Sequence, residues 1–203
     1  MKLYNSFGPN PKVVRMFMSE LGIDMEMVDV DIMAGENRQS DYLKVNPAGQ
    51  APALGLDDGT VITEITAICE YLDDLQGSTS LIGTTPQERA EARMWARRID
   101  IAIMEPMANG FRYAEGKDIF RGRMALIPHA ADDLKAIAQE RLSWLDGLIE
   151  GRDYICGSRF TMADIMLYAF LEFFSQMGQP IREENSNIVA WFERVKARPS
   201  AAA

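Results

Sequence analysis

The feature that most constrains this chain is a proline-centred turn between Asn46 and Leu54, with the sequence Asn-Pro-Ala-Gly-Gln-Ala-Pro-Ala-Leu. Pro52 lies where an apolar strand should begin, and proline is tolerated only at a strand start or edge because it has no N–H to donate. We expect the Ala51–Pro52 peptide bond to be cis. The N–H and C=O of Ala51 would then face away from the sheet, ready to pair with an extended peptide.

A single acidic residue follows this turn at the next junction between a strand and a helix. Glu64 opens an apolar helical segment that ends near Leu75. By itself it would be an ordinary first-turn acid, favoured by the helix dipole. The free N–H groups of a first helical turn attract carboxylates, however. Together, the turn and Glu64 predict a site for a small extended peptide that carries both an ammonium and a carboxylate group.

Composition excludes several classes of function. A net charge of −9 argues against nucleic acid or an anionic membrane as a partner. No apolar run approaches the roughly 20 residues of a membrane span, and we expect no signal peptide. Cys69 and Cys156 form no CxxC motif, and a single histidine argues against a zinc site or a Ser-His-Asp triad. We therefore expect a reduced, cytoplasmic protein without a metal.

The spacing of apolar residues predicts two regions of different architecture. In the first region, we expect strands and helices at residues 2–5, 13–21, 28–32, 52–56, 60–63 and 64–75. In the second region, only helices are expected, at residues 88–114, 129–149, 161–174 and 187–197. The first set gives a β-α-β unit joined to a hairpin and a helix.

A stretch rich in Gly, Ser and Thr separates the two regions, between residues 76 and 85. It is followed by Thr85-Pro86-Gln87-Glu88, a capping box with proline at the first helical position. We therefore expect an α/β domain at residues 1–76 and an all-α helical domain at residues 86–203.

A second motif lies far along the chain, in the segment Gly157-Ser158-Arg159-Phe160-Thr161-Met162-Ala163-Asp164. With the Gln50-Ala51-Pro52 turn and the Glu64 helix, it resembles the cytosolic glutathione transferases, of bacterial type, over essentially the whole chain. The resemblance implies a thioredoxin-like, glutathione-binding domain followed by a helical domain. It also implies that Thr161 caps a buried helix whose third residue, Asp164, returns a hydrogen bond to the loop.

The resemblance implies a role for each residue around the proline turn. The backbone of Ala51, held by Pro52, would pair with the cysteinyl part of glutathione. Gln50, and Arg38 from the preceding segment, would meet the glycyl carboxylate.

At the helix start, the resemblance implies that Glu64 binds the γ-glutamyl ammonium and that the N–H of Ile65 binds the adjoining carboxylate. Most family members have Ser or Thr where this chain has Ile65. Loss of that hydroxyl would weaken binding by roughly 1.5–3 kcal/mol unless another group replaces it. Thr66 is the candidate replacement.

The chemistry that the family performs is the generation of a thiolate. Lowering the pKa of glutathione's thiol by about two units requires roughly 2.7 kcal/mol of preferential thiolate stabilisation. Most members use Tyr, Ser or Cys in the first strand-to-helix turn, where this chain offers Ser6 and Asn10. Pro9-Asn10-Pro11 looks more like members that use an asparagine amide or a helix-bound water. We favour Asn10 over Ser6.

The resemblance implies a homodimeric detoxification enzyme that conjugates glutathione to a small hydrophobic electrophile. Met104, Met107, Phe111 and Tyr113 either line the cleft for that electrophile or belong to the core. Two alternatives stay open. A glutathione-dependent disulfide or peroxide reductase would act on a mixed disulfide, and a non-catalytic binding module would have no affinity for glutathione.

Overall fold

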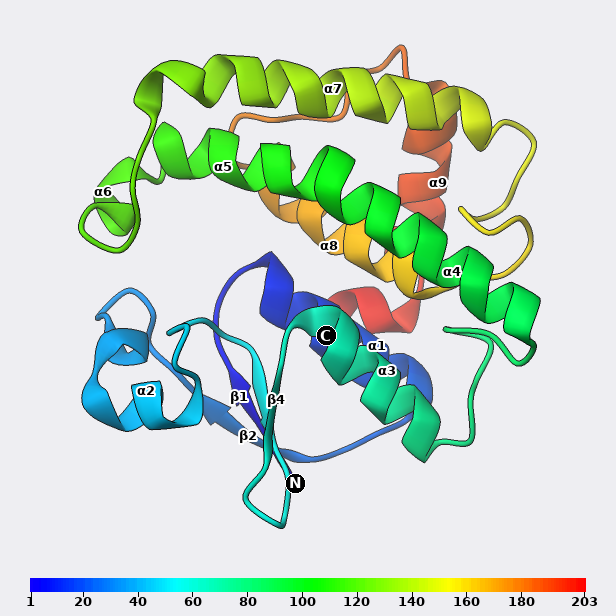
Figure 1. Ribbon diagram of the computed structural model, residues 1–203. Coiled ribbons are helices and arrows are strands. Elements are labelled where there is room, and N and C mark those ends of the chain that lie inside the picture. Colours follow the sequence, from blue (N-terminus) through cyan, green and yellow to red (C-terminus); the bar gives the residue numbers. More distant parts are fainter. The chain divides into compact units, whose positions relative to one another are not determined.

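The computed structural model describes all 203 residues, which divide into two compact units (Figure 1). One unit comprises Met1–Thr79 together with Pro199–Ala203, and the other comprises Ser80–Arg198. None of the helices combines the length and the apolar character that crossing a bilayer requires.

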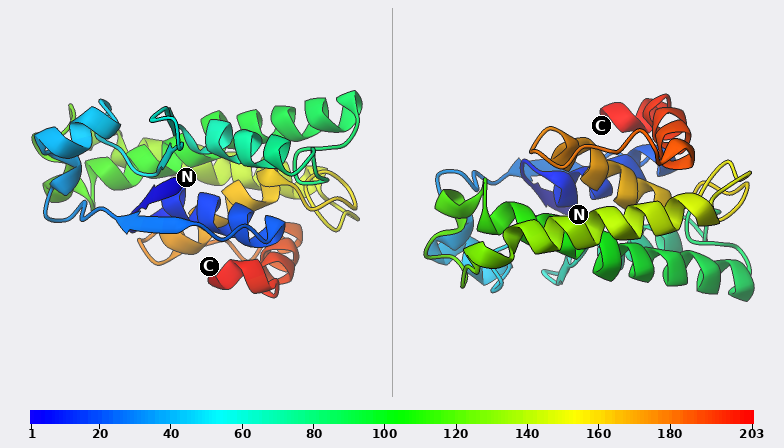
Figure 2. Two further views of the ribbon diagram at one scale, coloured as in Figure 1. Left: turned by 90° about the horizontal axis from the view of Figure 1, so that it is seen from below. Right: turned by 90° about the horizontal axis from the view of Figure 1, so that it is seen from above.

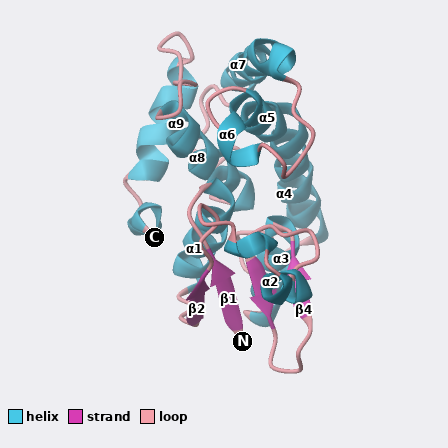
Figure 3. Cartoon of the chain, turned by 90° about the vertical axis from the view of Figure 1, so that its left-hand side faces the viewer, coloured by secondary structure: helices cyan, strands magenta, loops and turns pink.

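The first unit is built on a four-stranded sheet in the order β2-β1-β3-β4 (Figure 3). The central strand β1 runs parallel to β2 and antiparallel to β3, and β3 runs antiparallel to β4. The strands are β1 Lys2–Asn5, β2 Glu26–Asp29, β3 Ala53–Gly55 and β4 Val61–Thr63. The expected β-α-β unit and hairpin are both present.

One strand differs from its expected range. The alternation of Val28, Val30 and Ile32 predicted a strand at 28–32, but β2 ends at Asp29. β2 stops there because Asp29 lies opposite Asn5, the last residue of β1, so β1 has no further residue with which β2 can pair. The N–H of Val30 still donates to the carbonyl of Asn5 at 2.8 Å.

Helices α1 and α3 pack against each other in this unit. The helical elements are α1 Pro9–Leu21, η1 Glu36–Arg38, α2 Ser40–Val45, α3 Ile65–Leu75 and the C-terminal η4 Pro199–Ala202. Fully buried residues of helices and strands form one core: Leu3, Val13, Val14, Met16, Phe17, Ala53, Leu54, Ile68, Cys69 and Leu72. Helix α1 ends at Leu21, and the following Gly22 adopts the left-handed conformation that terminates it.

The second unit is helical, as expected. Its helices are α4 Pro86–Ile99, η2 Asp100–Met104, α5 Glu105–Tyr113, α6 Lys117–Phe120, η3 Pro128–Ala130, α7 Ala131–Leu148, α8 Met162–Ser175 and α9 Ser186–Lys196. Helix α7 runs alongside the path of α4 and α5 (Figure 2). The first ten residues of α8 are all buried, so this helix forms the centre of the unit.

The long helix expected at 88–114 contains a wider, π-helical stretch, η2, between α4 and α5. Its cause is Pro106, which has no N–H for the carbonyl four residues earlier and whose ring would clash with that carbonyl. Met104, which ends this stretch, and Met107, which follows in α5, are buried, so they belong to the core of the unit.

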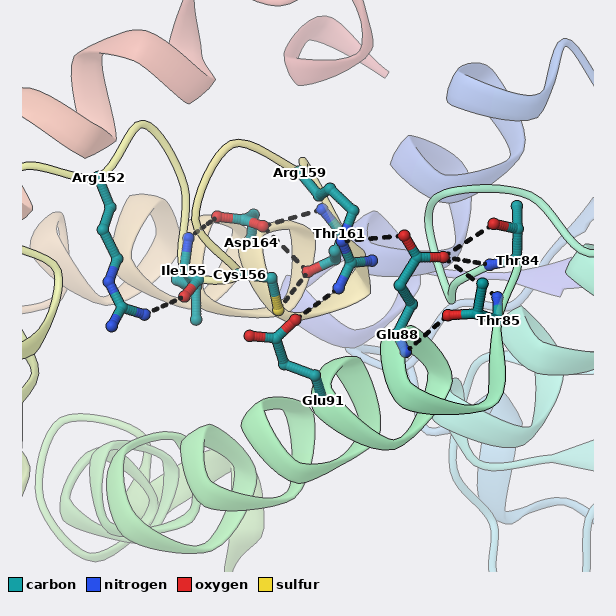
Figure 4. Close-up of polar contacts among 10 residues, drawn as sticks. All are labelled: Thr84, Thr85, Glu88, Glu91, Arg152, Ile155, Cys156, Arg159, Thr161 and Asp164. Atoms are coloured by element: carbon teal, nitrogen blue, oxygen red, sulfur yellow. Dashed lines mark hydrogen bonds and ion pairs between the residues drawn. The ribbon is translucent and has the colours of Figure 1, made fainter.

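The expected cap of α8 is confirmed (Figure 4). Asp164 accepts hydrogen bonds from the N–H and the hydroxyl of Thr161, at 2.9 and 3.1 Å. Its other oxygen accepts from the N–H of Ile155 at 2.9 Å and from the indole of Trp191 at 2.8 Å. Burial raises the pKa of Asp164, while these hydrogen bonds act in the opposite direction. One carboxyl group therefore joins the loop, α8 and α9.

The loop before α8 is also tied to the start of α4. Arg159 contacts Glu91 at 2.7 Å and Glu88 at 3.9 Å (Figure 4). Glu88 in turn accepts from the N–H of Thr85 at 3.1 Å, and its own N–H donates to the Thr85 hydroxyl at 3.2 Å. The capping box expected at Thr85 is thus confirmed.

We predict that Asp164→Ala lowers the free energy of unfolding by roughly 3–5 kcal/mol, because each buried N–H left without an acceptor costs about 1–3 kcal/mol. Urea denaturation of the purified chain measures this. The control is Asp118→Ala, which removes an exposed carboxylate paired with Arg121 and should change stability little. Equal effects of the two substitutions would contradict the role assigned to Asp164.

Candidate functional site

The register of the sheet brings three parts of the chain together at one end. Ala53 lies opposite Tyr4 on one side and Thr63 on the other. One residue further along, Pro52 therefore lies between the end of β1 and Glu64. The proline turn and the acidic residue singled out in the sequence are thus neighbours within the first unit.

The turn itself has the geometry expected of it. The Ala51–Pro52 peptide bond is cis, and Pro52 is buried at the start of β3. The N–H and C=O of Ala51 have no hydrogen-bond partner in the protein, although Ala51 is only half-buried. A peptide N–H and C=O with no partner, at the end of the sheet, are groups with which an extended peptide can pair.

The start of α3 offers one carboxylate and three free N–H donors beside the proline turn. Glu64 is exposed and precedes the helix at φ 69° and ψ 125°, a conformation that costs a non-glycine residue about 1–3 kcal/mol. Its side chain does not cap the helix, so the N–H groups of Ile65, Thr66 and Ala67 have no acceptor. The carboxylate of Glu64 and these N–H groups suit an ammonium and a carboxylate, respectively.

Gln50 belongs to the turn itself and Arg38 ends η1, and both residues are exposed. The guanidinium of Arg38 is 3.4 Å from the carbonyl oxygen of Ala48. A Cβ on Gly49 would come within 2.9 Å of that guanidinium, so the side chain lies directly against the turn. Arg38 therefore places a cation against the turn, and Gln50 adds an exposed amide side chain directly before Ala51 in the sequence.

The Ser6 hydroxyl already has a hydrogen-bond partner within the protein. Ser6 is buried, and its hydroxyl donates to the carbonyl of Val30 at 2.6 Å. Asn5 is held as well, because its amide donates to Asp29 at 2.8 Å and accepts from Arg15 at 2.7 Å. These contacts fasten the end of β1 to β2, which gives Ser6 and Asn5 a structural role.

The side-chain amide and the peptide N–H of Asn10, in contrast, have no hydrogen-bond partner within the protein. Asn10 is the second residue of α1 and is half-buried. Pro9 and Pro11 on either side carry no N–H. Asn10 therefore supplies the only peptide N–H among the first three residues of α1, together with a side-chain amide.

Three buried polar residues that support the turn were not predicted from the sequence. They are Asn37 of η1, Tyr42 of α2 and Asn46, which follows α2. Each donates a hydrogen bond to a carbonyl of the turn. In the sequence, Asn46 before Pro47 could have indicated this support, since asparagine side chains commonly form hydrogen bonds with the backbone of turns.

Comparison with known proteins gives matches to both units. The family model "Glutathione S-transferase, N-terminal domain" matches residues 1–74, and "Glutathione S-transferase, C-terminal domain" matches residues 128–194. Glutathione S-transferase 2 of Saccharomyces cerevisiae is 32% identical over 200 residues, which cover 95% of this chain and 84% of that protein.

Solved structures agree over the full length. The crystal structure of Gtt2 from Saccharomyces cerevisiae has a TM-score of 0.93 and 30% identity, covering 100% of this chain and 99% of that one. A glutathione S-transferase domain-containing protein of Marinobacter aquaeolei has a TM-score of 0.92 and 35% identity, covering 98% and 99%. The expected fold is confirmed: an α/β, thioredoxin-like unit followed by an all-α one.

Proposed function

Because this chain belongs to the glutathione S-transferase family, we propose that it conjugates reduced glutathione to a small hydrophobic electrophile. The observation that carries the proposal is the free backbone of Ala51 beside Glu64, with the unoccupied N–H groups of α3 next to both. That surface matches a tripeptide with an amide backbone, one ammonium and two carboxylates.

Each part of glutathione has a proposed partner. The N–H and C=O of Ala51 pair with the cysteinyl residue, in the manner of an added strand. The γ-glutamyl ammonium binds Glu64, and its carboxylate binds the first N–H groups of α3, with Thr66 in place of the hydroxyl missing at Ile65. Gln50 and Arg38 bind the glycyl carboxylate.

The proposed reaction forms one carbon–sulfur bond. The thiol first loses its proton to solvent, and the thiolate then attacks an electrophilic carbon, whose leaving group departs with the bonding electrons. Hydrogen bonds from Asn10 and the positive end of α1 stabilise the thiolate. The enzyme contributes this stabilisation and the proximity of the reactants, and no side chain acts as a nucleophile.

Within this proposal, Asn10 is the thiolate donor. The hydroxyl of Ser6 already donates to the carbonyl of Val30 and is buried, whereas the donors of Asn10 have no partner in the protein. We also place the enzyme in the cytoplasm, where its buried free thiols, Cys69 and Cys156, would stay reduced.

A homodimer is part of the same proposal. Exposed apolar residues lie two helical turns apart on α4–η2, at Met94 and Ile101, and on α7, at Ile137 and Trp144. The two helices are neighbours, since the rings of Trp95 and Trp144 are 6.3 Å apart. An apolar face of this kind suits a second copy related by a two-fold axis, where the same surface serves both partners.

We predict that Glu64→Ala raises the dissociation constant for glutathione at least tenfold, because it removes the carboxylate that binds the ammonium. Isothermal titration calorimetry measures this constant. Ser6→Ala should change it much less, and Glu64→Gln should give an intermediate value. Small and equal effects of Glu64→Ala and Ser6→Ala would contradict the proposed site.

Asn10→Ala is predicted to raise the pKa of bound glutathione, by about one unit if one hydrogen bond to the thiolate is lost. The rate of conjugation below that pKa should fall accordingly. The pH dependence of kcat/KM with an aryl halide as electrophile reports the shift. An unchanged profile for Asn10→Ala, with a shifted one for Ser6→Ala, would reverse the assignment of the donor.

Ile137→Glu is predicted to convert the dimer to a monomer, because it places an unpaired charge on the apolar face. Sedimentation velocity at micromolar concentration measures the change. The matched control is Ile127→Glu, at an isoleucine that is also exposed but lies before α7. A wild-type chain that sediments as a monomer, or a dimer that tolerates Ile137→Glu, would contradict this interface.

A further inference from the structure

We infer that Tyr42, Asn46 and Asn37 are positioning residues for glutathione, which aim the backbone of Ala51 by holding the carbonyl groups before it. This inference rests on the proposed function. It concerns side chains that do not touch the tripeptide and act through the turn.

Two of these side chains hold one carbonyl oxygen. The hydroxyl of Tyr42 donates to the carbonyl of Gln50 at 2.7 Å, and the side-chain amide of Asn46 donates to the same oxygen at 2.7 Å. The C=O of Gln50 and the N–H of Ala51 belong to one planar peptide group. Fixing the first therefore fixes the direction of the second, which is the donor proposed for the cysteinyl residue.

The same hydrogen bonds strengthen that donor. Hydrogen bonds to a peptide carbonyl polarise the whole group, so the opposite N–H becomes a better donor. Two donors on one carbonyl saturate its lone pairs, which also prevents the peptide plane from rotating. The N–H of Ala51 is thus directed and polarised before any ligand arrives.

Asn37 and Asn46 fix the residues just ahead. The side-chain amide of Asn37 donates to the carbonyl of Gly49 at 2.6 Å, and the side-chain amide oxygen of Asn46 accepts from the N–H of Ala48 at 3.0 Å. Gly49 has a φ of 61°, and a Cβ there would lie 2.9 Å from the backbone oxygen of Asn37. The backbone of η1 therefore packs directly against the turn, which leaves little room for movement.

The three side chains are themselves held firmly. Tyr42, Asn46 and Asn37 are all buried. The ring of Tyr42 packs edge-on against that of Tyr4 in β1, with centroids 6.0 Å apart, so the contact connects α2 to the sheet. Burial, and to a smaller extent Tyr4, raise the pKa of Tyr42 to about 12. Its neutral form is favoured in the fold, so the hydroxyl remains a donor until the pH approaches that value.

The test compares Tyr42→Phe with wild type and with Tyr71→Phe, which removes a tyrosine hydroxyl that makes no hydrogen bond in α3 of the same unit. Titration calorimetry with glutathione and with S-methylglutathione gives the dissociation constants. We expect Tyr42→Phe to weaken both ligands by a similar factor, about fivefold, because the peptide contact is common to them. Tyr71→Phe should leave both unchanged.

A purely structural role would give a different pattern. Tyr42→Phe would then lower stability to urea while leaving both dissociation constants unchanged, and that result would overturn the inference. The pKa of the bound thiol should not move, and the factor should be constant over roughly pH 6–9, where Tyr42 stays protonated. Selective loss of glutathione affinity with unchanged S-methylglutathione affinity would also overturn it.

Asn46→Asp is the second variant, for use if Tyr42→Phe fails to fold. It keeps an oxygen for the N–H of Ala48 and removes the donor to Gln50, so it should weaken both ligands at least as much. Wild-type protein that binds neither ligand would overturn the proposed function and this inference together. Wild-type binding with no effect of either variant would overturn the inference alone.

Discussion

The register of the short strand β3 is the constraint on which the proposed site depends. Because Ala53 lies opposite both Tyr4 and Thr63, the residues around it bring the end of β1, the proline turn and Glu64 to one end of the sheet. A shift of one residue would turn every side chain of β3 to the opposite face and separate these groups. With only three residues, β3 needs support from the buried Leu54 and from the side chains that hold the turn.

The parts of the structure that could be predicted from sequence depend on local chemistry. Pro52 marks a strand start because it lacks an N–H, and Gly22 ends a helix because it adopts the left-handed conformation at little cost. The caps at Thr85 and Thr161 each depend on a carboxylate three residues later. In each case the residue and its partner are close in sequence, so spacing alone identifies them.

The parts that could not be predicted depend on contacts between distant segments. The hydroxyl of Ser6 is bound by Val30 of the neighbouring chain segment, which only the sheet register reveals. From the sequence alone, Tyr42 resembles an ordinary apolar helix residue. Only the structure shows that its hydroxyl donates to the carbonyl of Gln50. The end of β2 is likewise set by the length of β1. The contact that occupies the Ser6 hydroxyl therefore required the structure, whereas the proline turn and Glu64 could be identified from the sequence.

We propose that this end of the sheet binds glutathione and promotes loss of its thiol proton. Calorimetric titration of the whole chain with reduced glutathione, at two pH values and in buffers of different ionisation enthalpy, tests it most directly. We predict saturable binding with release of a proton near neutral pH, since the bound thiol ionises more readily than the free one, whose pKa is about 8.5. If titration with neither glutathione nor S-methylglutathione produces heat at either pH, the fold is present without this chemistry.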